Sequence, residues 1–479
     1  MSPISQAQRV AVDQALGRLP FLDALREAFA AAGHRLYLVG GPVRDALLGV
    51  DCDDLDFTTS ARPDQIEQLL RPISSAIWDV GRDFGTIGAL LRTGGQEYRV
   101  EVTTFRADAY QPDTRKPVVA FGDRITDDLV RRDFTINAMA IDLADRSLID
   151  PYHGVADLAS STLRTPSEPE VSFTDDPLRM LRAARFASRF QLRPEPELVA
   201  AMTELAPRLQ IVSAERVRDE LSKLLLADRP RFGLDLMVRT GLAQQVLPEL
   251  PALRLEADEH HRHKDVYEHS LTVLDQAIVL ERERNHAPDL VNRLAALLHD
   301  VGKPRTRRFE PGGKVSFHHH DVVGAKLVRS RLTALRFPSD VVDSVSRLVE
   351  LHLRFHGYGD GQWTDSAVRR YVRDAGPELE RLHILTRSDC TTRNQAKATR
   401  LRRAYEELEW RIDELAAQEQ LEAIRPDLDG NQIMDLLGLK PGREVGEAYR
   451  YLLERRLDRG PVAPQVAQAE LLEWWAART

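Results

Sequence analysis

Two aspartates, Asp54 and Asp56, stand two positions apart beside a short apolar run. In a β-strand, residues i and i+2 point to the same face of the sheet, so these two carboxylates would project together. Carboxylates on one face repel each other unless a divalent cation lies between them. Because Mg²⁺ prefers a few carboxylates together with substrate phosphates, the spacing predicts a magnesium site that receives a phosphorylated substrate.

A phosphate cradle is predicted about a dozen residues earlier in the chain. The apolar run 36–39 ends at Gly40 and Gly41, and a helix-compatible segment follows. A glycine turn lets backbone amides approach an anion closely, and the N-terminus of a helix favours negative charge. A phosphate cradle close to a carboxylate pair indicates nucleotidyl transfer.

Further candidates for the same site follow along the chain. Glu101 alternates with valines on a predicted strand, where it could be a third metal ligand or could equally face solvent. Arg131 and Arg132 lie beside Asp133 and fit triphosphate and ribose contacts, because arginine binds phosphate through bidentate forks. An Arg-Arg-Asp sequence is also common on helix surfaces, so this segment is weak evidence by itself.

A row of polar residues at three-residue steps begins with Asp176 and continues with Arg179, Arg182 and Arg185. On a helix this spacing places them along one face. One interpretation is a capped helix with a solvated basic stripe. The other is base selection, because Asp accepts a hydrogen bond from cytosine N4 or adenine N6 while Arg donates to the neighbouring ring acceptor. Such a pair accepts C and A and rejects G and U.

A second set of histidines and aspartates occupies the region 256–400. A lone histidine on an apolar helix is usually a core residue, but here histidine and aspartate are adjacent and more of both follow. Imidazole and carboxylate together suit a hydrolytic site with a divalent metal. The candidate ligands are His269, His299, Asp300, His320, His352 and Asp389.

The elements that must position these residues are of two kinds. Residues 8–33 have helical periodicity, and period-two runs at 36–39, 55–58, 86–91 and 98–105 predict an α/β region with a mixed or antiparallel sheet. From about residue 172 the pattern is helical. The fold class expected is therefore α+β, and 479 residues suggest roughly three domains.

Composition limits the class of protein. Apolar residues make up 43% of the chain and charged residues 29%, as in soluble globular proteins. We find no apolar stretch near the roughly 20 residues that a membrane helix needs and no signal-peptide layout, so no membrane partner is expected. Two cysteines, Cys52 and Cys390, favour a reducing cytoplasm. A net charge of −8 means that nucleic acid would need a locally basic surface.

The chain resembles the bacterial class II tRNA nucleotidyltransferases, the CCA-adding enzymes of the nucleotidyltransferase and poly(A) polymerase superfamily. Five segments match the family's motifs in order: the Gly-Gly turn with the Asp54/Asp56 pair, residues 131–138, residues 150–158, the Asp176/Arg179 helix and the helix of Glu215 and Arg216. One departure is Asp175, where the family usually has glutamate.

The histidine-rich region resembles the HD phosphohydrolase superfamily. His269, the adjacent His299 and Asp300, and Asp389 match its core ligand pattern, while His320 and His352 resemble its additional ligands. The resemblance implies a divalent metal in this region. Whether the site hydrolyses phosphate esters or is a metal-bound structural relic stays open.

The resemblance implies four domains: a nucleotidyltransferase head at 1–165, a helical base-selecting neck at 166–255, an HD domain at 256–400 and a helical tail at 401–479. It implies Mg²⁺ in the head and tRNA, CTP and ATP as partners, and it does not indicate an oligomeric state. The 3′-hydroxyl of tRNA would attack the α-phosphorus, with Asp54 and Asp56 holding the metal ions. The residues implied to contact nucleotide are Gly41, Arg44, Arg132, Asp133, Asp176, Arg179, Arg182 and Arg185.

Three functions are compatible with the sequence. The first is addition or repair of the terminal CCA of tRNA. The second is a partial CC-adding or A-adding enzyme, or a poly(A) polymerase; we expect the polar, proline-broken loop 107–122 to carry this difference. The third is a hydrolytic HD protein whose head only binds nucleotide, and the intact Asp54/Asp56 pair argues against it.

Overall fold

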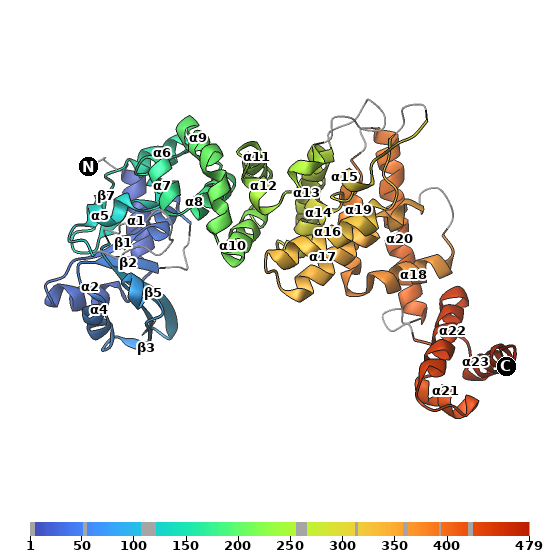
Figure 1. Cartoon of the computed structure of the whole chain (residues 1–479). Helices are drawn as coiled ribbons and strands as arrows, with labels where there is room; N and C mark the ends of the chain where they lie inside the picture. The colour runs from blue at the N-terminus through green and yellow to red at the C-terminus, as the bar shows by residue number, and fades with distance from the viewer. Residues whose placement is uncertain are drawn as a thin grey trace. The chain divides into compact units, whose positions relative to one another are not determined.

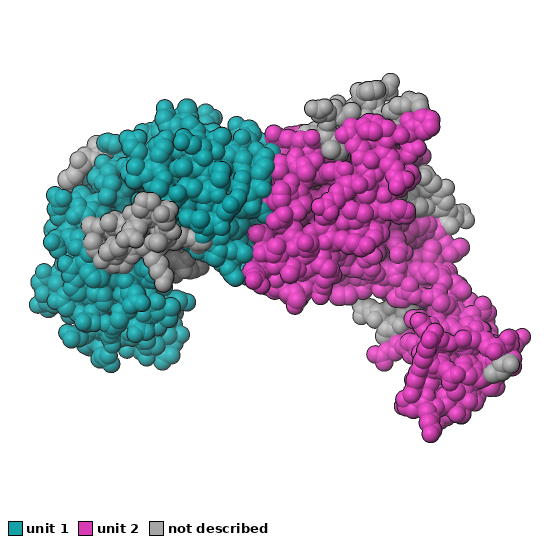
Figure 2. Space-filling view, in the orientation of Figure 1, with its two compact units in different colours: residues 1–246 teal, residues 247–479 magenta. Residues whose placement is uncertain are grey.

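The computed structural model describes residues 5–50, 55–106, 121–254, 266–311, 315–357, 363–391, 394–419 and 425–478. Asp54 and most of the loop 107–122 lie outside these residues. The chain divides into two compact units, residues 1–246 and 247–479, coloured teal and magenta in Figure 2. The finer division into four domains stays a prediction.

A seven-stranded mixed sheet forms the centre of the first unit, in the order β3-β4-β5-β2-β1-β6-β7. Only β2 and β5 pair in parallel; the other neighbours are antiparallel. The strands are β1 (Leu36–Val39), β2 (Leu55–Thr59), β3 (Ser74–Trp78), β4 (Thr86–Thr93), β5 (Gln96–Thr104), β6 (Ala140–Asp142) and β7 (Leu148–Ile149).

The mixed sheet followed by helices confirms the α+β class. The four strands expected from period-two runs correspond to β1, β2, β4 and β5. The strands β3, β6 and β7 were not expected, for physical reasons. β3 is an edge strand that is nowhere fully buried, and β6 and β7 are too short to establish a period.

The turn between β1 and α3 (Gly41–Leu48) depends on glycine. Gly40 has φ +76°, and a Cβ at this position would lie 2.7 Å from Nη1 of Arg132. Only glycine fits a left-handed conformation with a guanidinium so close. The Gly40 amide donates to the Met139 carbonyl, which fixes the turn beside β6.

Helices flank the sheet and then continue the first unit, as Figure 1 shows. Phe29, Phe57, Ile66 and Val102 are fully buried in the core between the sheet and its helices. The helices are α1 (Gln6–Gly17), α2 (Leu22–Ala31), α4 (Pro63–Leu70), α5 (Ile125–Val130), α6 (Gly154–Ser160), α7 (Pro169–Asp175), α8 (Leu178–Arg189), α9 (Pro196–Leu205), α10 (Ala214–Leu225), α11 (Arg231–Arg239) and α12 (Leu242–Val246).

α8 is the central helix after the sheet, because it packs against both α10 and α11. Most of its residues are buried, including Arg179 and Arg185. Two short strands, β8 (Thr162–Leu163) before α7 and β9 (Arg193–Pro194) after α8, pair in parallel.

The second unit is helical apart from a short hairpin of β10 (Arg308–Phe309) and β11 (Val315–Ser316). Within the described residues, no helix of either unit is long and apolar enough to span a membrane. The helices of the second unit are α13 (Val266–Glu283), α14 (Leu290–Leu298), α15 (Lys303–Thr306), α16 (His320–Ala334), α17 (Ser339–Leu351), α18 (Asp365–Ala375), α19 (Leu379–Asp389), α20 (Gln395–Glu419), α21 (Gly430–Leu437), α22 (Arg443–Arg459) and α23 (Pro464–Ala476).

A close backbone contact joins the starts of α15 and α16. A Cβ at Gly302 would lie 2.0 Å from the carbonyl oxygen of His320 and 2.8 Å from the amide nitrogen of Gly324. Glycine at position 302 therefore allows the segment after His299 and Asp300 to lie directly against the first turn of α16.

Candidate active sites

The parallel pairing of β2 with β5 brings two predicted carboxylates together. Asp56 and Glu101 are register partners on these adjacent strands, so their side chains leave the same face of the sheet. Both line a cavity of about 270 Å³, together with Asp128, Arg131 and Arg132. The structure thus puts Glu101 beside Asp56, which the sequence alone left open.

Arg132 lies over the glycine turn at one side of this cavity. Its Nη2 donates to Oδ2 of Asp128 at 3.1 Å, and Asp128 is almost fully buried. The same guanidinium sits where a side chain at Gly40 would project. A cationic fork above the glycine turn at the N-terminus of α3 is a suitable receptor for phosphate.

Asp133 is the hub of a buried polar network in the first unit. Its Oδ2 accepts from Arg182 Nε at 2.8 Å, and its Oδ1 accepts from Asn137 Nδ2 at 2.9 Å. Asn137 in turn accepts from Arg44 Nη1 at 2.5 Å. Burial opposes ionisation of Asp133, but the Arg182 charge and the Asn137 amide outweigh it and lower the pKa of Asp133 to about 2. The network therefore ties α3 to α8.

Arg185 extends this row into α10. Its Nε donates to Oε2 of Glu220 at 2.6 Å, and Arg182 Nη1 lies 3.6 Å from the other oxygen of the same carboxylate. Arg185 and Glu220 are both almost fully buried. Glu220 thus braces α8 against α10. Contacts of Arg182 and Arg185 with nucleotide stay predictions.

The Asp176/Arg179 pair is held by residues that the sequence only partly indicated. Oδ2 of Asp176 accepts from Arg216 Nη2 at 2.9 Å, so α10 braces the start of α8. Arg179 donates to Ser172 Oγ at 2.8 Å and to the Arg131 carbonyl at 2.6 Å. Ser172 was not predicted, because a serine on the preceding helix and a main-chain carbonyl carry no distinctive sequence pattern.

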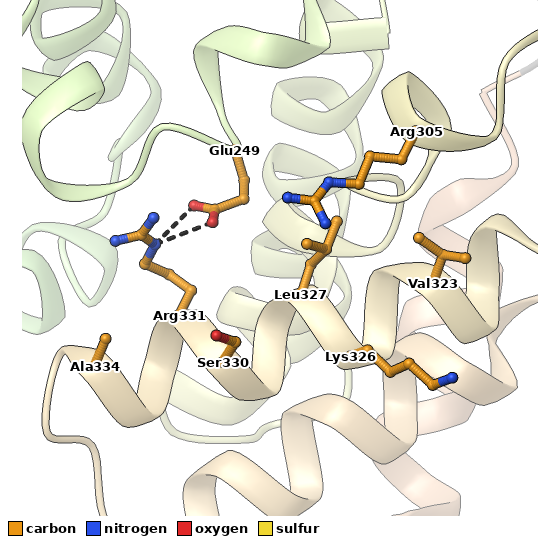
Figure 3. Close-up of a pocket in the computed structure, with 8 residues that line it drawn as sticks. All are labelled: Glu249, Arg305, Val323, Lys326, Leu327, Ser330, Arg331 and Ala334. Carbon is orange, nitrogen blue, oxygen red and sulfur yellow. Dashed lines mark hydrogen bonds and ion pairs between the residues drawn. The ribbon is translucent and has the colours of Figure 1, made fainter.

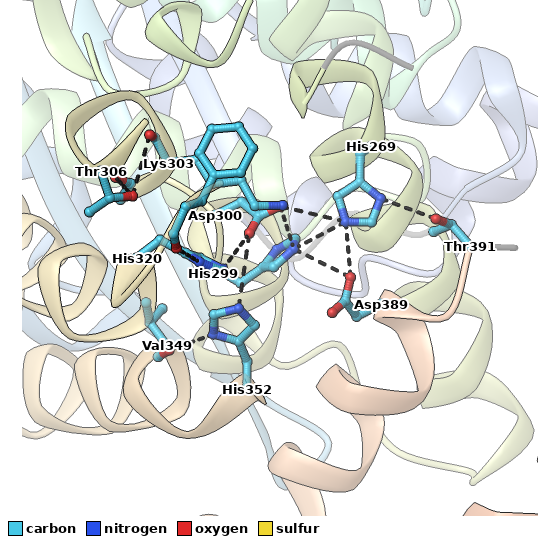
Figure 4. A network of polar contacts seen from close by, with 12 residues as sticks. His269, His299, Asp300, Lys303, Thr306, His320, Val349, His352, Asp389 and Thr391 are labelled. Atoms are coloured by element: carbon cyan, nitrogen blue, oxygen red, sulfur yellow. Dashed lines mark hydrogen bonds and ion pairs between the residues drawn. The ribbon is translucent and has the colours of Figure 1, made fainter. Parts of the chain in front are cut away.

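Six side chains of the second unit converge in a separate cluster (Figure 4). They form two groups, and within each group the potential ligand atoms all lie within 4.8 Å of one another. The first group is His269, His299 and Asp389; the second is Asp300, His320 and His352.

Asp300 stands between the two groups. Its Oδ2 lies 3.3 Å from Nε2 of His299, and its Oδ1 lies 3.3 Å from Nε2 of His320. Asp300 therefore has one oxygen toward each group and would be available as a ligand to a divalent metal there. Lys303 Nζ also donates to Oδ2 at 2.8 Å.

Three of the imidazoles are oriented by the main chain. Nδ1 of His299, His320 and His352 lies 2.6–2.9 Å from the carbonyl oxygen of the residue three positions earlier. His269 uses the Thr391 hydroxyl instead, at 3.1 Å. These contacts direct all four Nε2 atoms inward, as in histidines that ligate metals.

The ionisation of the cluster is coupled. Burial opposes the charge of His299, but Asp300 and Asp389 outweigh it and raise the pKa of His299 to about 10, so a metal ion that binds its Nε2 displaces a proton. The imidazole neighbours outweigh burial and hold the pKa values of Asp300 and Asp389 well below the ordinary range. Burial and the charge of His299 lower the pKa of His352 to about 4. Nε2 of His320 and of His352 is buried without a hydrogen bond of good geometry among the described residues. Orphaned nitrogens beside ionised carboxylates fit a divalent metal.

Comparison with known proteins decides the family. The A-adding tRNA nucleotidyltransferase of Deinococcus radiodurans is 36% identical over 447 residues, which cover 91% of this chain and 95% of that protein. The CC-adding tRNA nucleotidyltransferase of Thermus thermophilus is 32% identical over 451 residues, 92% of this chain and 94% of that protein. The chain belongs to the tRNA nucleotidyltransferase family.

Models of single-domain families match the regions of this nucleotidyltransferase that contain the two candidate sites. The poly(A) polymerase head domain matches residues 36–164, and the HD domain matches residues 266–394, which include all six candidate ligands. A family described as the probable RNA- and SrmB-binding site of polymerase A matches residues 191–253. The nucleotidyltransferase has the fold of the Bacillus stearothermophilus CCA-adding enzyme in complex with CTP, with a TM-score of 0.69 and 24% identity over 96% of this chain and 98% of that chain.

Proposed function

We propose that this chain adds or repairs the 3′-terminal CCA of tRNA in the cytoplasm, transferring CMP and AMP from CTP and ATP with release of pyrophosphate. The observation that carries the proposal is the held Asp176/Arg179 pair, in the same unit as the Asp56/Glu101 cavity. That pair selects bases without a nucleic-acid template, and the cavity receives the triphosphate.

The carboxylates and the glycine turn have different roles at the triphosphate: the first hold metal, and the second binds phosphate. Asp56 and Glu101, with Asp54, would hold Mg²⁺, since carboxylate oxygens are its preferred protein ligands. Bound Mg²⁺ lowers the pKa of the attacking hydroxyl and neutralises the leaving pyrophosphate. Arg132 and the amides after Gly40 bind and align the phosphates.

Base selection follows from the donor and acceptor pattern. Asp176 accepts from the exocyclic amino group that cytosine and adenine share, while Arg179 donates to the adjacent ring nitrogen. Guanine and uracil present a carbonyl where Asp176 needs a donor. Two acceptors facing each other leave both unpaired, which costs more than a neutral mismatch.

The test uses purified full-length protein, Mg²⁺, labelled CTP or ATP, and three tRNAs that end at the discriminator base, at C or at CC. We expect ordered addition of C, C and A that then stops, and loss of incorporation by at least 100-fold in Asp56→Ala. Addition of one nucleotide type would instead indicate a CC-adding or A-adding enzyme, and a long A tail a poly(A) polymerase. No incorporation at all would contradict the proposal.

A second activity is favoured by the two adjacent groups of candidate ligands, since Asp300 of the second group also lies 3.3 Å from His299 of the first. We propose that the HD cluster hydrolyses phosphate esters when divalent metal is bound. The expected result is metal-dependent phosphate release from p-nitrophenyl phosphate or its diester, abolished in Asp300→Ala and retained in Asp56→Ala. Metal binding without hydrolysis of either compound would mean that the cluster is structural.

A further inference from the structure

A cavity on the outer side of α16 is lined by hydrogen-bond donors and lies apart from both sites described above. Its volume is about 440 Å³, within the range of ligand-binding pockets. Figure 3 shows Glu249 opposite Arg331, with Arg305 reaching from α15 toward Leu327 and Lys326 at the outer edge. All of these residues belong to the second unit.

The charges in this cavity do not cancel. Glu249 is its only acid, and both of its oxygens accept from Arg331 Nε, at 2.9 and 3.0 Å. That contact uses one side of the guanidinium, and the two terminal nitrogens of Arg331 have no acceptor among the described residues. Arg305 and Lys326 are exposed, and their side chains likewise have no partner in the described part of the chain.

The other lining residues indicate what kind of ligand the cavity would accept. Ser330 adds a hydroxyl, while Val323 and Leu327 give an apolar floor. Such a surface fits a ligand that is rich in acceptors, carries negative charge and has an apolar sugar face. The sugar–phosphate backbone of a nucleic acid has these properties, and arginine binds its phosphates through paired donors.

The layout favours a polymer over a small anion. From Lys326 to Arg331, α16 advances by about 8 Å at 1.5 Å per residue. A linear polyanion can meet donors spread over that length, whereas a single phosphate meets one or two. Glu249 also lies inside the segment 191–253 that matches the probable RNA-binding family.

We propose that this cavity binds the sugar–phosphate backbone of the tRNA substrate, with Arg305 and Arg331 as its main phosphate contacts. The proposal rests on the function proposed above, which makes tRNA the substrate. It assigns a positively charged docking surface to a chain whose net charge is −8. Sequence recognition is not expected there, because phosphate contacts carry none.

The experiment measures binding of fluorescent tRNA lacking CCA by anisotropy, from 50 to 300 mM salt, with Arg305→Ala and Arg329→Ala. Arg329 is a matched control, since it also lies on this part of the unit but pairs with Asp343 at 2.5 Å instead of lining the cavity. Loss of one phosphate contact should reduce the slope of log K against log salt by about one and weaken binding about fivefold at 0.15 M salt. We expect this for Arg305→Ala and no change for Arg329→Ala.

Two results would overturn the proposal. One is equal behaviour of both variants, whether both bind normally or both lose affinity. The other is normal tRNA binding by Arg305→Ala together with loss of a thermal shift induced by inorganic phosphate, which would mean a small-anion site. Incorporation of labelled CTP by the wild-type protein is scored separately, so failure of the proposed function is distinguishable from failure of this surface.

Discussion

At the scale of single residues, the proposed role of Arg179 in base selection depends on the groups that hold its guanidinium. Ser172 and the Arg131 carbonyl together occupy both terminal nitrogens of its guanidinium. A long side chain with several rotamers is thereby limited to one orientation. In the base-selecting role proposed for Arg179, its remaining N–H groups are then held in one direction.

Substitution of Ser172 by alanine should reduce discrimination between CTP and UTP. A hydrogen bond to a charged group is worth roughly 1.5–3 kcal/mol, so the ratio of the two kcat/KM values should fall by about 10- to 100-fold. The matched control is Ser188→Ala in α8, which removes a buried hydroxyl bonded to the Gly233 amide and leaves Arg179 untouched. Equal discrimination in Ser172→Ala and Ser188→Ala would refute the positioning role of Ser172.

At the scale of elements, the contact between the starts of α15 and α16 sets the spacing of the candidate metal ligands. His299 and Asp300 lie just before α15, and His320 is the first residue of α16, so their separation depends on how closely the two segments pack. The nearest atoms that a Cβ at Gly302 would meet are all backbone atoms, those of His320 and Gly324. They cannot move aside as a flexible side chain can.

The variant Gly302→Ala should therefore separate the two ligand groups. We expect a loss of stability of about 1–3 kcal/mol from overpacking and at least a tenfold loss of metal-dependent phosphate release. Nucleotide incorporation by the first unit should remain. Thermal unfolding and the phosphate assay measure the two effects, with Gly430→Ala as control because nothing lies within 4 Å of a Cβ there. Unchanged phosphate release in Gly302→Ala would show that this close approach is dispensable.

At the scale of the whole molecule, the sequence predicted the class of fold and most of the residues that the structure gathers at the two candidate sites. Local patterns sufficed for β1, β2, β4 and β5, and adjacent residues such as His299 and Asp300 were recognisable as a pair. The pairing of Asp56 with Glu101 was not predictable, because it depends on which of two distant strands lie side by side and in which register. The division of six ligands into two groups and the role of Ser172 likewise depend on packing between helices.

The support of the metal cluster has a consequence for how this protein can change over generations. His299, His320 and His352 take their orientation from main-chain carbonyls, which every amino acid provides. Replacing the side chains at Ala296, Phe317 or Val349 leaves those oxygens in place. The residues around the cluster can therefore diverge in sequence while the histidines keep their orientation. Descendants of this chain can retain the cluster even when the sequence around it has changed.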